Sequence, residues 1–125
     1  MNTLLKKLPL LLIAIGAILL SSCDIEPVSP VNPNASELEV QVYGAISGAP
    51  REGIRVSLHA SEYDARNNIN PLAGYAWTDI DGFVYFYGLP PNEQYHIRAK
   101  ALLVKSIRTT NYLNRGYNFQ AVPIL

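Results

Sequence analysis

The chain has 125 residues, enough for one small domain, and its ten basic and ten acidic residues give a formal net charge of zero. This balance excludes the strongly basic surface typical of nucleic-acid-binding proteins, so we expect no nucleic-acid partner. The single cysteine, Cys23, excludes an intrachain disulfide. Removing the leader predicted below, which contains two lysines, leaves eight basic and ten acidic residues and a net charge of about −2.

The first 22 residues predict a signal peptide. Lys6 and Lys7 form a positive n-region, and residues 8–20 follow as an apolar run of 13 residues. A helix that crosses a bilayer needs about 20 apolar residues, so this run is typical of the h-region of a signal rather than of a permanent span.

The apolar run ends in Leu20-Ser21-Ser22-Cys23. This stretch resembles a bacterial lipobox, in which an aliphatic residue and two small residues precede the cysteine that is lipidated. The resemblance implies a diacylglyceryl thioether and an N-acyl chain on Cys23, and such chains hold a protein on a membrane. The alternative is an ordinary secretory signal with an unrelated cysteine.

Residues 23–36 predict a lipidated cysteine followed by a disordered tether. Pro27, Pro30 and Pro33 are evenly spaced among serine and asparagine residues, and proline fixes φ and removes a backbone donor. Extended, residues 24–36 would span roughly 40 Å. That length would let the following domain, residues 37–125, stand clear of the lipid headgroups.

The domain is predicted to consist of short strands, because no segment from residue 37 onward shows a convincing helical period. Apolar and polar residues alternate over residues 37–47 and 54–59, which predicts two half-buried strands. The asparagine-rich residues 60–73 are predicted to be irregular, with a length that is often functional or mobile. Further strands are predicted at residues 75–78, 83–87, 95–100, 103–109 and 116–124. Pro123 favours an edge or terminal position for the last one. Seven short strands predict an all-β, antiparallel sandwich.

The central prediction is a hairpin over residues 75–87. Its turn is Asp79-Ile80-Asp81-Gly82, in which aspartate accepts nearby backbone N–H groups and Gly82 supplies a positive φ. Such an Asp-Gly turn between two β-prone runs is typical of a hairpin.

A tyrosine corner is predicted directly after the hairpin. Leu89, Pro91 and Tyr95 have its Leu-x-Pro-x-x-x-Tyr spacing. We therefore expect the Tyr95 hydroxyl to bond to backbone in residues 89–91.

The order of features from residue 42 to residue 99 resembles the carboxypeptidase regulatory-like domain, of the transthyretin-like (prealbumin-like) sandwich class. The matching positions are Gly44, Pro50, Gly53-Ile54-Arg55-Val56, Thr78-Asp79-Ile80-Asp81-Gly82, the aromatic strand 83–86, Leu89-Pro90-Pro91 and Tyr95. One departure is Asn92-Glu93-Gln94, where the family usually has a glycine. The alternative is a fibronectin type III-like fold, which shares the tyrosine-corner spacing; the Thr-Asp-x-x-Gly motif favours the first.

The resemblance implies a fold and no enzymatic activity. Related 5-hydroxyisourate hydrolases end in Tyr-Arg-Gly-Ser, whereas this chain ends Ala-Val-Pro-Ile-Leu. Related pilin-like modules form Lys–Asn isopeptide bonds from a first-strand lysine, and residues 37–47 contain none. We expect no catalytic residue and no isopeptide bond.

No metal or cofactor is expected either. His59 and His96 fall on the polar faces of their strands, where we predict them to be solvated. Asp79 or Asp81 could complete a ligand set with them, but no zinc-type spacing supports one. The Asp79-x-Asp81-Gly82 segment lacks the later carboxylates of a calcium loop.

The candidate binding surface is aromatic. In the family register, Val84 and Phe86 point inward, so Phe83, Tyr85 and Tyr87 point outward, with Trp77 on the neighbouring strand. These rings would form a platform for a glycan or an envelope protein. The alternatives are that residues 60–73 or Trp77 cover the rings, or that a slip of one residue makes them the core face.

Taken together, these expectations describe a lipid-anchored lipoprotein of the envelope of a Gram-negative bacterium, by resemblance one of the Bacteroidota. The outer membrane is favoured over the inner. Its sandwich is expected to be a non-catalytic structural or interaction module, and the alternative is a carbohydrate-binding accessory protein.

Overall fold

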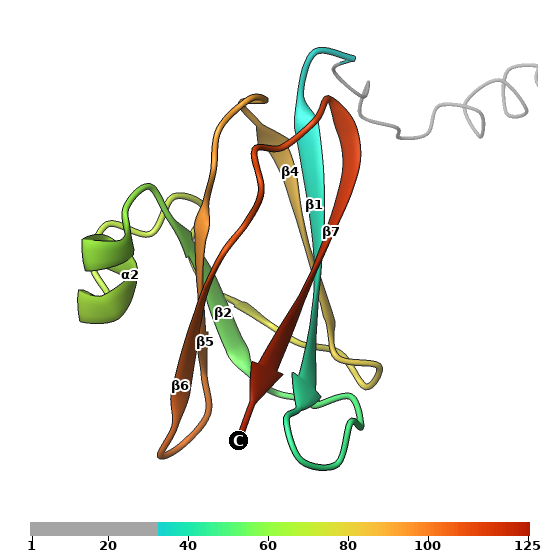
Figure 1. Ribbon diagram of the computed structural model, residues 1–125, viewed down its shortest axis with the longest axis vertical. Helices are drawn as coiled ribbons and strands as arrows, with labels where there is room; N and C mark the ends of the chain where they lie inside the picture. The colour runs from blue at the N-terminus through green and yellow to red at the C-terminus, as the bar shows by residue number, and fades with distance from the viewer. Residues whose placement is uncertain (1–32) are drawn as a thin grey trace, which may run out of the picture. The chain divides into compact units, whose positions relative to one another are not determined.

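A computed structural model describes residues 33–125, which form seven strands and one short helix (Figure 1). Their order is β1 (Ser36–Gly44), β2 (Arg55–His59), α2 (Glu62–Asn67), β3 (Ala76–Trp77), β4 (Phe83–Leu89), β5 (His96–Lys100), β6 (Lys105–Thr109) and β7 (Gly116–Ile124). The predicted signal peptide, Cys23 and most of the predicted tether lie outside the described residues.

The strands form two sheets. Sheet A has the order β4-β1-β7, and sheet B has the order β3-β2-β5-β6. The prediction of an all-β sandwich with seven strands is confirmed. Within the described part of the chain, no helix is long and apolar enough to cross a membrane.

The core lies between the two sheets and is built from the alternation seen in the sequence. On β1, Leu38, Val40 and Val42 are at most 1% exposed, while the residues between them are half-buried. The core side chains are Leu38, Val40, Val42, Ile54, Val56, Leu58, Val84, Phe86, Leu89, Tyr95, Ile97, Ala99, Leu113, Val122 and Ile124. Both sheets therefore contribute one apolar face each, as expected for a sandwich.

The prediction of a wholly antiparallel sandwich was wrong in one pairing. β7 runs parallel to β1 through nine paired residues, from Ser36 opposite Gly116 to Gly44 opposite Ile124. The chain reaches β7 from β6, which lies in sheet B, so β7 joins sheet A through a crossover rather than a hairpin. Alternation in a sequence indicates which face of a strand is buried. It does not indicate whether the neighbouring strand runs parallel or antiparallel. Pro123 does lie on an edge strand, as predicted.

The predicted hairpin over residues 75–87 was also wrong, because its two strands belong to different sheets. β3 pairs with β2 in sheet B, whereas β4 pairs with β1 in sheet A. The Asp79–Gly82 turn therefore carries the chain from one sheet to the other. Its local chemistry is as predicted: Asp79 Oδ1 accepts from the N–H groups of Asp81 and Phe83, both at 2.9 Å. Gly82 has a φ of 82°.

Residues 60–73 contain a helix that the sequence analysis missed. Ser61 caps it, since its hydroxyl oxygen accepts from the Asp64 N–H at 3.1 Å, and Asn68 ends it in the left-handed region. Six helical residues are too few to show a periodic pattern. The Ser61-Glu62-Tyr63-Asp64 sequence was the available signal, because a Ser with an acidic residue three positions later marks a helix start.

Candidate binding surface

The outer face of sheet A carries the aromatic ladder, defined here as Phe83, Tyr85 and Tyr87 on β4. Val84 and Phe86 are 5% exposed and point into the core, so the ladder points outward. Tyr85 is 47% and Tyr87 is 67% exposed, and Phe83 is half-buried. The predicted register is therefore correct, and the alternative that these rings form the core is wrong.

The three rings of the ladder lie nearly parallel. The centroids of Phe83 and Tyr85 are 6.1 Å apart with an angle of 21° between the planes, and those of Tyr85 and Tyr87 are 6.3 Å apart with an angle of 15°. Neighbouring rings restrict one another, so the ladder offers apolar area with little rotamer freedom to lose on binding.

A second set of aromatic rings lies across the sheet, on β7. Tyr117 is 62% and Phe119 is 47% exposed. Phe119 and Tyr85 are both register partners of Glu39 on the central strand β1. The strand over residues 116–124 was predicted from the sequence, but its outer face was not assigned, because the parallel pairing that brings these rings beside β1 leaves no local signal.

Glu39 is the polar centre of this face. The Tyr117 hydroxyl donates to Glu39 Oε1 at 2.8 Å. The hydrogen bond to the Glu39 carboxylate raises the pKa of Tyr117, and the pKa of Tyr85 is raised by the same carboxylate. The outer face of sheet A therefore combines rings on both edge strands with a carboxylate between them.

Trp77 is not part of this face. It lies on β3 in sheet B, 62% exposed, opposite Arg55 of β2. It neither covers the ladder nor extends it, so the prediction that groups Trp77 with Phe83, Tyr85 and Tyr87 was wrong. The reason is the crossing at residues 79–82, which separates two segments that are adjacent in sequence.

An open groove of about 350 Å³ lies at the end of the ladder. Leu72 and Ala73 line it together with Tyr87 and Glu93. Residues 60–73 therefore border Tyr87, the last ring of the ladder, without burying it. The alternative that these residues cover the ring is wrong.

The tyrosine corner borders the same groove. The Tyr95 hydroxyl donates to the carbonyl oxygen of Pro90 at 2.8 Å, within the predicted segment that also contains Leu89 and Pro91. Tyr95 is 2% exposed, and its burial raises the pKa of its hydroxyl. The corner fixes the path of the chain between β4 and β5, and it has no free hydroxyl for a ligand.

A buried polar cluster lies under α2, contrary to the prediction of a solvated His59. His59 is 0% and Ser57 is 1% exposed, because residues 60–73 cover the polar face of β2. His59 Nε2 lies 2.9 Å from Ser57 Oγ, and His59 Nδ1 lies 2.7 Å from the carbonyl oxygen of Ile69. A carbonyl only accepts, so Nδ1 carries the proton and the serine hydroxyl donates to Nε2.

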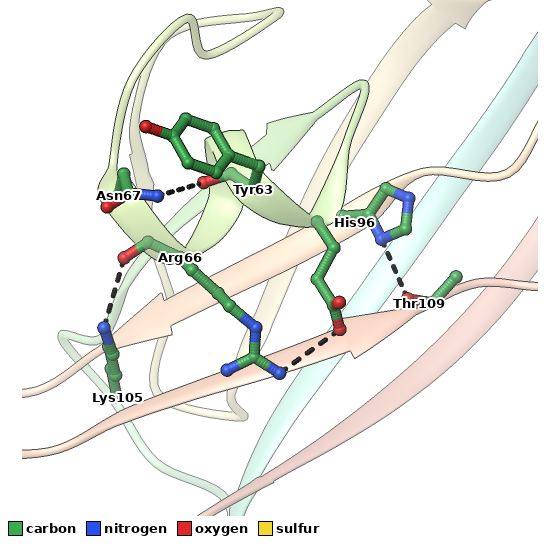
Figure 2. A network of polar contacts seen from close by, with 7 residues as sticks. Tyr63, Arg66, Asn67, His96, Lys105 and Thr109 are labelled. Atoms are coloured by element: carbon green, nitrogen blue, oxygen red, sulfur yellow. Dashed lines mark hydrogen bonds and ion pairs between the residues drawn. The ribbon is translucent and has the colours of Figure 1, made fainter.

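Arg98 completes the cluster from β5. Its Nη1 donates to the carbonyl oxygens of Ala65 at 3.0 Å and Arg66 at 3.2 Å, at the end of α2. Burial lowers the pKa of Arg98, and burial likewise lowers the pKa of His59. Exposed contacts continue the attachment of α2, including Lys105 Nζ to the Arg66 carbonyl oxygen at 3.1 Å (Figure 2).

This cluster holds α2 on the sheet and has no opening for a substrate. Ser57 and His59 have the spacing of a nucleophile and a base, but neither is accessible to solvent. His96 is half-buried and lies 2.8 Å from the Thr109 hydroxyl (Figure 2). No group of three metal-ligating side chains occurs among residues 33–125.

Comparison with known proteins identifies the fold alone. No family model matches the chain, and no curated protein matches it. The chain is similar in structure to the group B streptococcus pilus 2b backbone protein, with a TM-score of 0.51 and 17% identity over 70% of this chain and 40% of that protein. It is also similar to BcpA, the major pilin subunit of Bacillus cereus, with a TM-score of 0.45 and 12% identity over 73% of this chain and 30% of that one. The chain thus spans less than half of either pilus protein, and the first similarity shows a β-sandwich of pilin-like form.

Proposed function

We propose that this protein is a lipid-anchored lipoprotein of the bacterial envelope whose β-sandwich is a non-catalytic structural and interaction module. The main support for this proposal is the outer face of sheet A, where exposed rings on two strands flank Glu39. Such rings give large contact area at low entropic cost, which is why they concentrate in binding hot spots.

Three further features support this role. The lipobox at residues 20–23 would place the domain at a membrane. The solved structure with the higher TM-score is, by its name, a backbone component of a pilus. The motifs at residues 78–82 and 89–95 favour membership of the carboxypeptidase regulatory-like class over the fibronectin type III-like alternative.

The second candidate is a carbohydrate-binding accessory protein. The groove at the end of the ladder favours it, because Tyr87 there lies near the carboxylate of Glu93 and the amide of Gln94. A ring beside side chains that can exchange hydrogen bonds is the usual composition of a small polar ligand site.

The test is photo-cross-linking in living cells with the full-length chain. A photoreactive amino acid is placed at Tyr87, which is 67% exposed on the ladder, or at Tyr63, which is 68% exposed on α2. We expect adducts from position 87 and few from position 63, and treatment with a protease or a glycosidase separates a protein partner from a glycan. Equal adduct formation at the two positions would contradict a binding role for this face.

A further inference from the structure

The turn between β5 and β6 carries two leucines that folding does not explain. Leu102 is 90% and Leu103 is 88% exposed, and a hydrogen bond from the Ala101 N–H to the Val104 carbonyl oxygen at 2.9 Å closes the turn beneath them. Turns favour Gly, Asn, Asp, Pro or Ser, and Ala-Leu-Leu-Val contains none of these. The two side chains bury almost nothing in the fold, so their apolar surface is available for a contact outside it.

The leucine tip, meaning Leu102 and Leu103, is flanked by cations. Lys100 and Lys105 are register partners at its base, and Arg55 on β2 is the partner of Lys100 on the other side. Trp77 is the partner of Arg55, so one row of sheet B reads Trp-Arg-Lys-Lys across all four strands. Partners in a row point to the same face, which here is the outer one.

The charges of this row are not neutralised within the domain. Lys100 Nζ donates to the Leu102 carbonyl oxygen at 3.2 Å, and Lys105 Nζ donates to the Arg66 carbonyl oxygen at 3.1 Å. In the described part of the chain, the one ion pair is Arg66 with Glu62. The Arg55 guanidinium lies over the Tyr75 ring, 4.7 Å from its centroid, a contact that leaves its positive charge in place. The row therefore keeps its positive charge and can attract an anionic surface.

We propose that the leucine tip is a membrane-contact site that inserts into an anionic lipid bilayer. The two leucines enter the edge of the hydrocarbon layer, while Lys100, Lys105 and Arg55 bind the phosphates of the headgroups. Apolar side chains flanked by cations bind such surfaces through hydrophobic insertion and through electrostatic attraction to anionic lipids. Trp77 lies in the same row and is 62% exposed, and tryptophan is enriched at membrane interfaces.

A bilayer suits this tip better than a protein partner does. A stable protein interface buries about 1,200 Å² or more in complementary surfaces, and the tip is a narrow turn of two apolar side chains. Fluid lipid needs no complementary shape. Asp79 and Asp81 belong to the turn that leads into sheet A, whereas the row of cations belongs to sheet B.

The position of the tip in the domain is compatible with this contact. β1 begins at one end of the sandwich, and the β5–β6 turn lies at the other (Figure 1). The nine residues of β1 span about 30 Å, and the predicted tether could span roughly 40 Å. The tether is therefore long enough for the domain to lie back and bring the tip to the bilayer that holds Cys23.

The experiment uses residues 33–125, so that lipidation plays no part. This piece is suitable because the whole core lies within residues 38–124 and residues 33–125 lie in one compact unit. Flotation with vesicles of phosphatidylcholine is compared with flotation with vesicles that also contain phosphatidylglycerol. We expect binding to the anionic vesicles, weakened by salt, with a blue shift in the fluorescence of Trp77, the single tryptophan.

The variants separate the leucines from the charges. Leu102→Ser with Leu103→Ser should lower partitioning by about tenfold or more, because two apolar side chains no longer enter lipid. Lys100→Gln with Lys105→Gln should remove the preference for anionic vesicles. The matched control is Tyr112→Ser, since Tyr112 is 66% exposed but lies in the segment before β7, at the end of the sandwich where β1 begins; it should bind as the unaltered domain does.

The proposal is overturned if the unaltered domain floats with neither vesicle type, or if the double serine variant binds as tightly as the Tyr112→Ser control. All of the substituted side chains are largely exposed or half-buried, so the midpoint of thermal unfolding should stay unchanged. This measurement checks that each variant is folded. The inference rests on the proposed membrane location, but this assay contains neither Cys23 nor the cross-linker. Its failure is thus distinct from failure of the proposed function.

Discussion

At Gly82 a backbone conformation and a close approach coincide. Its φ is 82°, and a Cβ built there would lie 2.5 Å from the carbonyl oxygen of Val42 and 3.2 Å from the Cβ of Pro50. The Gly82 carbonyl oxygen also accepts from the Val42 N–H at 2.8 Å, which joins the turn to β1. A side chain would therefore disturb both the turn and the first pairing of sheet A.

We expect Gly82→Ala to cost more than the roughly 1–2 kcal/mol of a left-handed non-glycine residue, since the collision with Val42 adds to that strain. Gly82→Val should cost more still. Gly74→Ala is the matched control, because Gly74 has a φ of 75° with open space around it. Ile80→Ala, at a 71% exposed position, should change stability by about 0.5 kcal/mol or less. Urea unfolding measures all four, and equal midpoints for the Gly82 and Gly74 variants would contradict the close approach.

Tyr95 contributes to stability through a single hydroxyl group. Tyr95→Phe leaves the Pro90 carbonyl oxygen without its donor at a side chain that is 2% exposed. We expect a loss of about 1–2 kcal/mol in the free energy of unfolding. Tyr87→Phe, on the exposed ladder, should change it by about 0.5 kcal/mol or less. An unchanged denaturation midpoint for Tyr95→Phe would remove the tyrosine corner as a stabilising feature.

At the scale of elements, α2 shows how an exposed segment is fastened by buried polar groups. His59 bonds to the carbonyl oxygen of Ile69, and Arg98 bonds to those of Ala65 and Arg66. Desolvation lowers the pKa of His59 below 6.5, and the charges of Arg98 and His96 act in the same direction. The hydrogen bond to the Ile69 carbonyl oxygen and the Asp64 carboxylate act in the opposite direction and only partly offset it. The folded protein therefore holds His59 neutral where the unfolded chain has begun to protonate it.

This difference predicts a loss of stability in mild acid. Because the unfolded state binds the proton more readily, the free energy of unfolding falls as the pH drops from about 6.5 toward the lowered pKa of the folded state. We expect amides of residues 60–73 to exchange faster with solvent deuterium at pH 5 than at pH 7, after correction for intrinsic rates. His59→Gln should flatten the dependence of unfolding free energy on pH in this window. An equal slope in the variant and the unaltered protein would show that His59 does not act in this way.

How much of these elements could be predicted depends on whether the signal is local. The alternation of Leu38, Val40 and Val42 predicted β1, and the spacing of Leu89, Pro91 and Tyr95 predicted the hydrogen bond to Pro90. Sheet membership of β3 and β4 was not predictable, because the same Asp-Gly turn serves a hairpin and a crossing between sheets. Residue 103 was assigned to a strand, since a turn made of Ala-Leu-Leu-Val has no turn residues to reveal it.

The candidate binding surface, too, could be predicted only where the sequence signal is local. The outward direction of Tyr85 and Tyr87 follows from period two and a core register, and it was predicted correctly. Tyr117 and Phe119 join the same face only through the parallel pairing of β7 with β1, which links residues about 80 positions apart. His59 was expected to be solvated because its strand alternates, but burial there comes from α2, an element outside the strand.

At the scale of the whole molecule, polar and apolar groups are sorted by face and by end. The outer face of sheet A carries rings around Glu39, and the uncovered end of sheet B carries Arg55, Lys100 and Lys105 beside Trp77. The leucine tip extends that end, while β1 begins at the opposite one (Figure 1). Acyl chains before β1 and a membrane-contact tip at the far end would hold the domain at two points and leave sheet A open to a partner.

The anchor itself is the prediction on which this arrangement depends. The full-length chain expressed in a Gram-negative host with labelled palmitate should take up the label, sediment with membranes and require detergent for release, because acyl chains add about 0.8 kcal/mol for each CH₂ buried. Cys23→Ala should lose the label. Ser22→Ala keeps a small residue before the cysteine and should keep the label.

A salt wash separates the anchor from the leucine tip. Electrostatic contacts between exposed charges are screened over about 3 Å at 1 M salt, so concentrated salt should release the Cys23→Ala protein from the membrane pellet and leave the unaltered lipoprotein in place. Label on the Cys23→Ala protein, or its retention in the pellet after the salt wash without detergent, would show that residues 20–23 do not direct lipidation. The domain would then reach the membrane by another route, and the two-point arrangement would be wrong.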